Sequence, residues 1–269
     1  MKLEDVFEQT HKLPTIPKVV QELIDSFSNE DVDIDTIAKQ IALDQVITAK
    51  VLRLANSAHF GASRKIGSVH EAVVVLGFST VRTLVVASGI TGAFIPTAGF
   101  DRKKFWKNSL QVASLAKALA KSAKINSEIS FTAGMIHNIG ELLIHIVAPD
   151  VATKIDLFVA NGADRVALED NNIGFDYVMV GEELTRRWNF PEEIQAAIKY
   201  QNVPNTPLSA VLHLAKIIAA QQAESASLEQ IAQAIPSLLA LQVGLEPKDL
   251  LLTLEELSHL SSGLDELIS

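Results

Sequence analysis

Apolar residues recur along the chain with the spacing of amphipathic helices. In the segment 17–27 each apolar residue has another three or four positions away, as on one face of a helix, at Val19, Val20, Leu23, Ile24 and Phe27. Pro17 suits the first helical position, where no backbone N–H is needed. The pattern predicts an all-α fold without internal repeats, with helices at about 17–27, 35–42, 46–58, 68–77, 79–90, 101–122, 127–146, 150–161, 174–188, 191–200, 207–222, 227–241, 247–254 and 255–268.

Two short motifs mark helix starts. Ser68-x-x-Glu71 and Ser227-x-x-Gln230 have the residue types of a capping box, in which side chains satisfy the first free N–H groups of a helix. The valine-rich run at 73–75 would also suit a buried strand. No hairpin signal flanks that run, and the capping box favours a helix.

Pro96 and Gly99 lie in a stretch without helical periodicity, which predicts a connection. We therefore expect three parts: an N-terminal helical lobe at 1–97, a helical core at 98–222 and acidic C-terminal helices at 223–269. The last part is amphipathic in places. We expect it to pack on the core, with a groove for a partner as the alternative.

The net charge of −9 is unevenly distributed. From Glu224 to the C-terminus there are eight acidic residues and one lysine, so this segment carries −7 and the remainder is nearly neutral. Broad nucleic-acid affinity needs clustered lysine and arginine, and the composition therefore argues against it. The absence of cysteine excludes disulfides and thiolate zinc sites.

The segment Ala72–Ile95 is apolar enough to be considered as a membrane span. An arginine near the middle of a span, as Arg82 would be, costs roughly 2.5–3.5 kcal/mol on insertion scales. We therefore expect buried helices of a soluble core. The N-terminus lacks an apolar stretch of signal-peptide length, so a cytoplasmic location is expected.

The segment 131–143 contains the run Ala-Gly-Met-Ile-His137-Asn138-Ile-Gly140. It resembles the A-G-L-L-H-D-I-G-K segment of HD-domain phosphohydrolases, with Asn138 in place of the aspartate. Other segments resemble one branch of that superfamily, the HDOD family (HD-related output domain): Leu13-Pro14-x-x-Pro17, 44–58, 66–77, Phe105-Trp106-x-x-Ser109 and Gly181 through Trp188-Asn-x-Pro191. The resemblance covers roughly residues 10–220 and implies a multi-helix HD-like bundle.

Catalytic HD enzymes hold divalent ions with histidines and carboxylates, and the resemblance implies which positions of this chain correspond to those ligands. The matching positions here are Asn108, His137, Asn138, Tyr177, Gln201, Asn202 and Lys216. Asn138 lacks the negative charge of the aspartate that it replaces, and the positive charge of Lys216 would repel a divalent ion. We therefore expect no metal, no cofactor and no HD-type hydrolysis. His137 is expected to be buried and hydrogen-bonded, with Asn138, Asn108 or Asn202 as partner.

The N-terminal lobe raises a separate possibility. Two helices within 35–60 suggest a helix-turn-helix, and there are basic residues near them, namely Lys39, Lys50, Arg53, Arg64 and Lys65. A DNA-reading helix exposes polar and basic side chains, whereas 46–55 is apolar over most of its circumference and is predicted to be buried. Asp44, Arg53 and Asn56 are expected to cap helix ends or form an interface. Gly77 and Trp106 are expected to be structural.

These observations favour a non-catalytic signal-transduction or scaffold module that contacts other signalling proteins. The link to bacterial signalling is implied by the family resemblance alone. Three alternatives remain open. They are a metal-dependent phosphohydrolase or phosphodiesterase with substitute ligands, a helix-turn-helix-like nucleic-acid binder, and a small-molecule or nucleotide site in the remnant pocket.

Overall fold

The computed structural model describes residues 2–8, 14–27, 33–56, 65–94, 99–246 and 249–258. These residues form helices without a strand, which confirms the predicted all-α class. The helices are α1 (Leu3–Glu8), α2 (Lys18–Asp25), α3 (Ile34–Leu43), α4 (Gln45–Ala55), α5 (Val69–Leu76), α6 (Phe78–Ala93), α7 (Arg102–Ser122), α8 (Ser127–Ile136), α9 (Ile139–Val147), α10 (Pro149–Val159), α11 (Arg165–Ile173), α12 (Tyr177–Arg187), α13 (Glu192–Lys199), α14 (Pro207–Ala223), α15 (Leu228–Ala234), α16 (Ser237–Gln242) and α17 (Leu250–Ser258).

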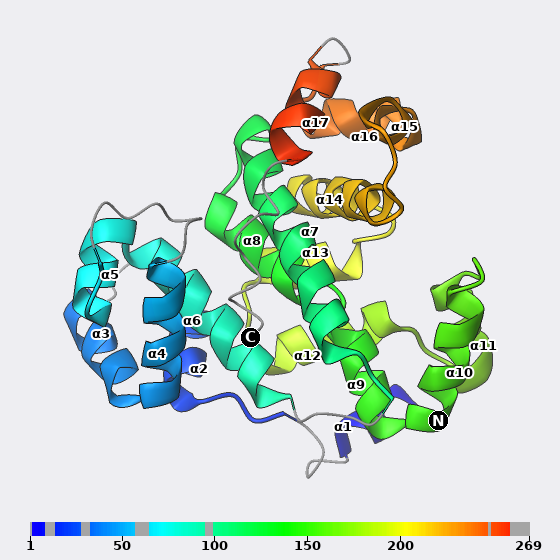
Figure 1. Cartoon of the computed structure of the whole chain (residues 1–269). Coiled ribbons are helices and arrows are strands. Elements are labelled where there is room, and N and C mark those ends of the chain that lie inside the picture. The colour runs from blue at the N-terminus through cyan, green and yellow to red at the C-terminus, as the bar shows by residue number, and fades with distance from the viewer. Residues whose placement is uncertain are drawn as a thin grey trace.

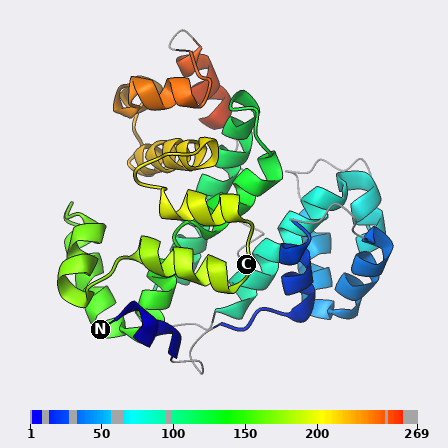
Figure 2. The same ribbon diagram turned by 180° about the vertical axis from the view of Figure 1, so that it is seen from behind.

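The helices α3, α4 and α5 form a lobe at one side of the molecule (Figure 1). Helix α6 leads out of this lobe and packs against α2 and α4 and also against α8. At the centre α7 pairs with α8, α14 packs on α7, and α12 packs between α9 and α13. The view from behind shows α15–α17 stacked beyond α14, at the opposite end of the molecule from α1 (Figure 2).

Aromatic side chains join the N-terminal lobe to the rest of the fold. The ring of Phe94, just after α6, meets the rings of Trp106 and Trp188 edge-on, at 6.3 Å in both cases. Gln21 of α2 donates a hydrogen bond to the Trp188 carbonyl at 2.8 Å. Trp106 is therefore a core residue at the junction between α6, α7 and the end of α12.

The predicted helix starts are confirmed. The Ser68 hydroxyl accepts from the N–H of Glu71 at 3.1 Å, and Ser227 with Gln230 forms a full capping box. Gly77 separates α5 from α6 with a φ of 83°, a conformation that suits glycine. The valine-rich run at 73–75 is helical.

Several helix boundaries differ from the prediction. The helix expected at 127–146 is divided into α8 and α9, and the one expected at 227–241 is divided before Pro236 into α15 and α16. Helix α11 was not predicted, although Asp164 caps its start and Gly174 ends it in the left-handed conformation. Leu13, Arg64, Pro96 and most of the helix expected at 255–268 lie outside the described residues.

Among the described residues no helix is both long and apolar enough to cross a bilayer. The described part of the segment considered as a span lies mostly in α5 and α6, which Gly77 separates, and Arg82 of α6 is buried. Its guanidinium donates to the Ser26 carbonyl at 2.9 Å and lies 4.0 Å from the centre of the Phe27 ring. This charge therefore holds the end of α2 against α6.

Candidate functional site

His137 and Asn138 lie at the break between α8 and α9. The two glycines of the surrounding motif explain how the break is held. A Cβ at Gly134 would collide with the backbone of Ala113 in α7, and a Cβ at Gly140 would collide with the Tyr177 carbonyl at the start of α12. These close approaches fix α8 on α7 and α9 on α12, one on each side of His137.

His137 is buried, and its Nδ1 lies 2.7 Å from the carbonyl oxygen of Gly134, one turn earlier. Burial and the positive charge of Lys216 lower the pKa of His137 to about 3, so the imidazole is neutral near pH 7. The expected pairing with an asparagine side chain is wrong. The nearest acceptor is a backbone carbonyl of the same helix, which needs no partner from another element.

Ser109, and not Asn108, contacts Asn138. The Ser109 hydroxyl donates to Asn138 Oδ1 at 2.9 Å, and both residues are buried. Asn108 is exposed on α7, and its side chain forms no hydrogen bond in the described part of the chain. Successive helical residues point about 100° apart. A shift of one position therefore moves a side chain from the pocket to the surface.

Lys216 of α14 is the centre of a compact polar group. Its ammonium donates to Asn202 Oδ1 at 2.6 Å, to Gln201 Oε1 at 2.7 Å and to the Tyr177 hydroxyl at 3.2 Å. An ammonium has three N–H donors, so all three are used. The Gln201 amide also donates to the His137 carbonyl at 2.8 Å, which connects the group to the break between α8 and α9.

Burial lowers the pKa of Lys216 to about 8, and the nearby charge of Glu141 opposes this by raising it. Burial and the same carboxylate raise the pKa of Tyr177, so its phenol stays neutral. The structure thus brings His137, Tyr177, Gln201, Asn202 and Lys216 to one place, whereas Asn108 lies outside it.

A second cluster, missed in the sequence, lies beside this group. The Arg165 guanidinium is 2.5 Å from Asp156 Oδ1, 3.3 Å from Glu169 Oε1 and 3.7 Å from Glu141 Oε2. His145 Nε2 lies 2.9 Å from Asp156 Oδ2. We call these five residues the Arg165 cluster. It joins α9, α10 and α11.

Tyr177 connects the two groups. Its hydroxyl accepts from Lys216, and its backbone N–H donates to Glu169 Oε2 at 2.6 Å. Burial raises the pKa of Glu169 to about 7, although the Tyr177 N–H and Arg165 act in the opposite direction. Arg165 and Glu169 stand four residues apart, a spacing that would have indicated an ion pair had α11 been predicted.

The residues around Lys216 do not suit the divalent ion that the resemblance to HD phosphohydrolases implies. Such ions take imidazole nitrogens and carboxylates, whereas an ammonium here holds two amides and a phenol. In the described ranges no three histidine or carboxylate side chains gather in a way that could hold a metal.

The polar residues of the N-terminal lobe act separately. Asp44 Oδ1 accepts two N–H groups of the first turn of α4, each at 3.0 Å. Asn56 accepts from the N–H of Ile66 and donates to its carbonyl, both at 2.8 Å, and so pairs with the backbone like a strand residue. Arg53 is exposed and has no partner among the described residues.

The prediction that the helix at 46–55 is buried is wrong. Ile47, Val51 and Ala55 of α4 are buried, but Val46 is 67% exposed and Arg53 also faces solvent. Neighbouring helices cover one side of α4 only. Because apolar residues lie on most sides of this helix, the sequence pattern does not indicate which side is covered.

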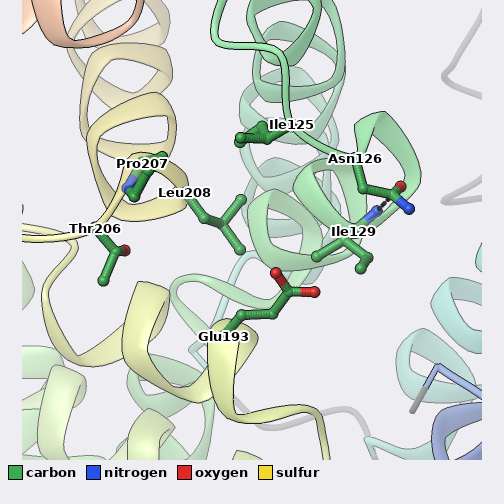
Figure 3. Close-up of a pocket in the computed structure, with 7 residues that line it drawn as sticks. All are labelled: Ile125, Asn126, Ile129, Glu193, Thr206, Pro207 and Leu208. Atoms are coloured by element: carbon green, nitrogen blue, oxygen red, sulfur yellow. Dashed lines mark hydrogen bonds between the residues drawn. The ribbon is translucent and has the colours of Figure 1, made fainter.

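A small pocket of about 150 Å³ lies between α8, α13 and α14 (Figure 3). It is lined by Ile125, Asn126, Ile129, Glu193, Thr206, Pro207 and Leu208. Burial raises the pKa of Glu193, yet this residue remains largely exposed, and the Asn126 side chain caps α8. The pocket therefore lacks a buried polar group that would orient a ligand.

The sequence matches the family model of the HDOD domain over residues 13–204. An uncharacterized protein of Treponema pallidum (strain Nichols) is 25% identical over 206 residues, which is 75% of this chain and 40% of that protein. The uncharacterized protein YuxH of Bacillus subtilis (strain 168) is 24% identical over 55% of this chain and 36% of its own length. The chain thus spans less than half of either curated relative.

Solved structures share the fold. A crystal structure from Shewanella amazonensis SB2B, provisionally named a phosphohydrolase, is 33% identical, covers 98% of both chains and has a TM-score of 0.82. An HDOD domain protein of unknown function from Geobacter sulfurreducens is 24% identical, covers 98% of this chain and 97% of its own, and has a TM-score of 0.84. A protein from Marinobacter aquaeolei VT8, provisionally named a signal transduction protein, is 22% identical, with a TM-score of 0.77 over 97% of this chain and 59% of that one.

Proposed function

The chain belongs to the HDOD family, and we propose that it is a non-catalytic regulatory module that acts by binding other signalling proteins. The hydrogen bonds of Lys216 are the main support. An HD-type hydrolase activates water on a bound ion, and here an ammonium lies among the corresponding side chains. Its three N–H groups already have acceptors, which leaves no donor for a phosphate group.

The name of the Shewanella structure raises the alternative of a phosphohydrolase with substitute ligands. Such ligands would have to be carboxylates or imidazoles near His137. Glu141 is the carboxylate whose charge acts on Lys216, and it also contacts Arg165. Two cations therefore compete with any ion for this one carboxylate, which argues against the alternative.

Nucleic-acid binding is the other candidate, because α4 exposes Arg53. The basic residues beside it have a structural explanation. Arg102 donates to the Thr91 carbonyl in the last turn of α6, and the Lys50 ammonium lies close to Gly92. Cations at the carboxyl end of a helix are stabilised by its dipole. This favours a structural role for both.

An activity assay tests the proposal. Wild-type protein is incubated with bis(p-nitrophenyl) phosphate and p-nitrophenyl phosphate in the presence of Mn²⁺, Ni²⁺, Zn²⁺ or Mg²⁺, beside a His137→Ala control. We expect equal background rates for both proteins. A metal-dependent rate that His137→Ala abolishes would contradict the proposal.

Two binding experiments test the partner. Affinity capture with the full chain should retrieve a defined protein, whereas a salt-sensitive gel shift that is lost in Arg53→Ala would favour nucleic acid instead.

A further inference from the structure

Three separate elements meet at the Lys216 ammonium. Tyr177 is the first residue of α12, Gln201 and Asn202 follow the end of α13, and Lys216 lies in the middle of α14. The three acceptor oxygens lie 2.6–3.2 Å from one nitrogen. A central cation with oxygen ligands from several helices is the arrangement by which a metal ion stabilises a helical bundle.

The charge of the surroundings suits an ammonium. All three acceptors are uncharged, and His137 is kept neutral by burial. Glu141 is the carboxylate whose charge acts on Lys216. A hard divalent ion would need several anionic oxygens here, whereas a single positive charge is satisfied by neutral oxygens and one carboxylate.

We infer that the Lys216 ammonium is a built-in replacement for a structural metal ion, joining α12, the end of α13 and α14 without any dissolved ion. The inference rests on the proposed lack of catalysis at this site. It adds that the site is permanently filled by the chain itself. The Tm of the wild-type protein should therefore not change when a chelator or a divalent metal ion is added.

The first test compares Lys216→Met with the control Lys199→Met, which removes an exposed ion pair with Glu182. Methionine keeps the aliphatic part of the side chain but removes the ammonium donor from three oxygens, of which Gln201 Oε1 is on a buried residue. We expect the Tm to fall by roughly 6–12 °C for Lys216→Met, the shift for about three lost hydrogen bonds in a chain of this size. The control should change by less than about 2 °C.

The opposite result is possible on physical grounds and would overturn the inference. If the hydrogen bonds contributed nothing, removing a partly buried charge would leave the Tm unchanged or raise it, because its desolvation cost disappears. Such a result would leave the proposed function intact. Metal-dependent hydrolysis by the wild type would instead contradict the proposed function.

The second test restores an ion. The variant Lys216→Ala/Gln201→Glu/Asn202→Asp vacates the centre and supplies two carboxylates of the same shape as the amides they replace. It also removes the hydrogen bonds that the Gln201 amide donates to the carbonyls of His137 and Ile198. We expect Mn²⁺ to raise the Tm of this variant by several degrees and EDTA to reverse the rise, with no effect of either on the wild type. A folded variant that ignores Mn²⁺, or a wild type that EDTA destabilises, would overturn the inference. If the variant does not fold, the comparison of Lys216→Met with Lys199→Met decides alone.

Discussion

Two partly buried cations lie on either side of Tyr177, and they are stabilised in different ways. Lys216 is held by neutral oxygens, whereas Arg165 contacts three carboxylates. Burying a charge costs several kcal/mol unless partners compensate for the lost water. The comparison shows two kinds of compensation in one site. Around Lys216 the number of donors matches the number of acceptors, whereas around Arg165 one cation is shared by three carboxylates.

The largest effect is expected for Arg165→Met. The change leaves Glu141, Asp156 and Glu169 without their common cation, and we expect a loss of about 3–5 kcal/mol in the free energy of unfolding. The control is Arg186→Met, which removes an exposed ion pair with Glu183 and should cost at most about 1 kcal/mol. Urea unfolding measures both. Equal losses would show that the Arg165 cluster contributes no more than a surface pair.

The contributions of His137 and Glu169 to the free energy of unfolding should also change with pH in opposite directions. The folded-state pKa of His137, about 3, is below its ordinary value of 6.5. The unfolded chain therefore takes up this proton first, and stability falls as the pH drops below about 6.5. The folded-state pKa of Glu169, about 7, is above its ordinary value of 4.5. Its contribution to stability therefore falls as the pH rises from about 4.5 to 7.

Single variants separate these opposing slopes. From pH 7 to pH 5, His137→Asn should gain about 2 kcal/mol relative to the wild type, because the Glu169 contribution is no longer opposed by that of His137. Glu169→Gln should lose about 2 kcal/mol relative to the wild type over the same interval, because the His137 contribution is no longer opposed by that of Glu169. The wild type should change little. Urea unfolding at several pH values measures the slopes, and slopes of equal sign in the two variants would contradict the assignment.

Glu141 is shared by the two cations, and Glu141→Gln tests how much each depends on it. We expect a loss of about 1–2 kcal/mol, smaller than for Arg165→Met because Arg165 keeps two carboxylates. The pKa of Lys216 should fall below about 8, since the charge of Glu141 raises it. NMR titration of the lysine side chains reports this pKa, with Lys216 assigned from the signal missing in Lys216→Met. An unchanged titration would show that Glu141 does not support Lys216.

The sequence indicated the Lys216 side of this comparison but not the Arg165 side. His137, Tyr177, Gln201, Asn202 and Lys216 stand at positions that the family resemblance marks, and glycines flank His137. Arg165, Asp156 and Glu169 belong to no such motif. Their meeting depends on α11, which has only a short apolar pattern between two polar caps. The exposure of Val46 could not be predicted either, because it depends on which neighbours cover α4.

The smallest expected effect tests the register at the edge of the site. Ser109→Ala removes the donor to the buried Asn138 oxygen, which should cost about 1–2 kcal/mol in unfolding free energy. Asn108→Ala changes an exposed side chain and should remain within about 0.5 kcal/mol of the wild type. Thermal unfolding of the two neighbouring variants under one condition is sufficient. A larger loss for Asn108→Ala would place residue 108 in the pocket and return the site to the arrangement that the family resemblance alone implied.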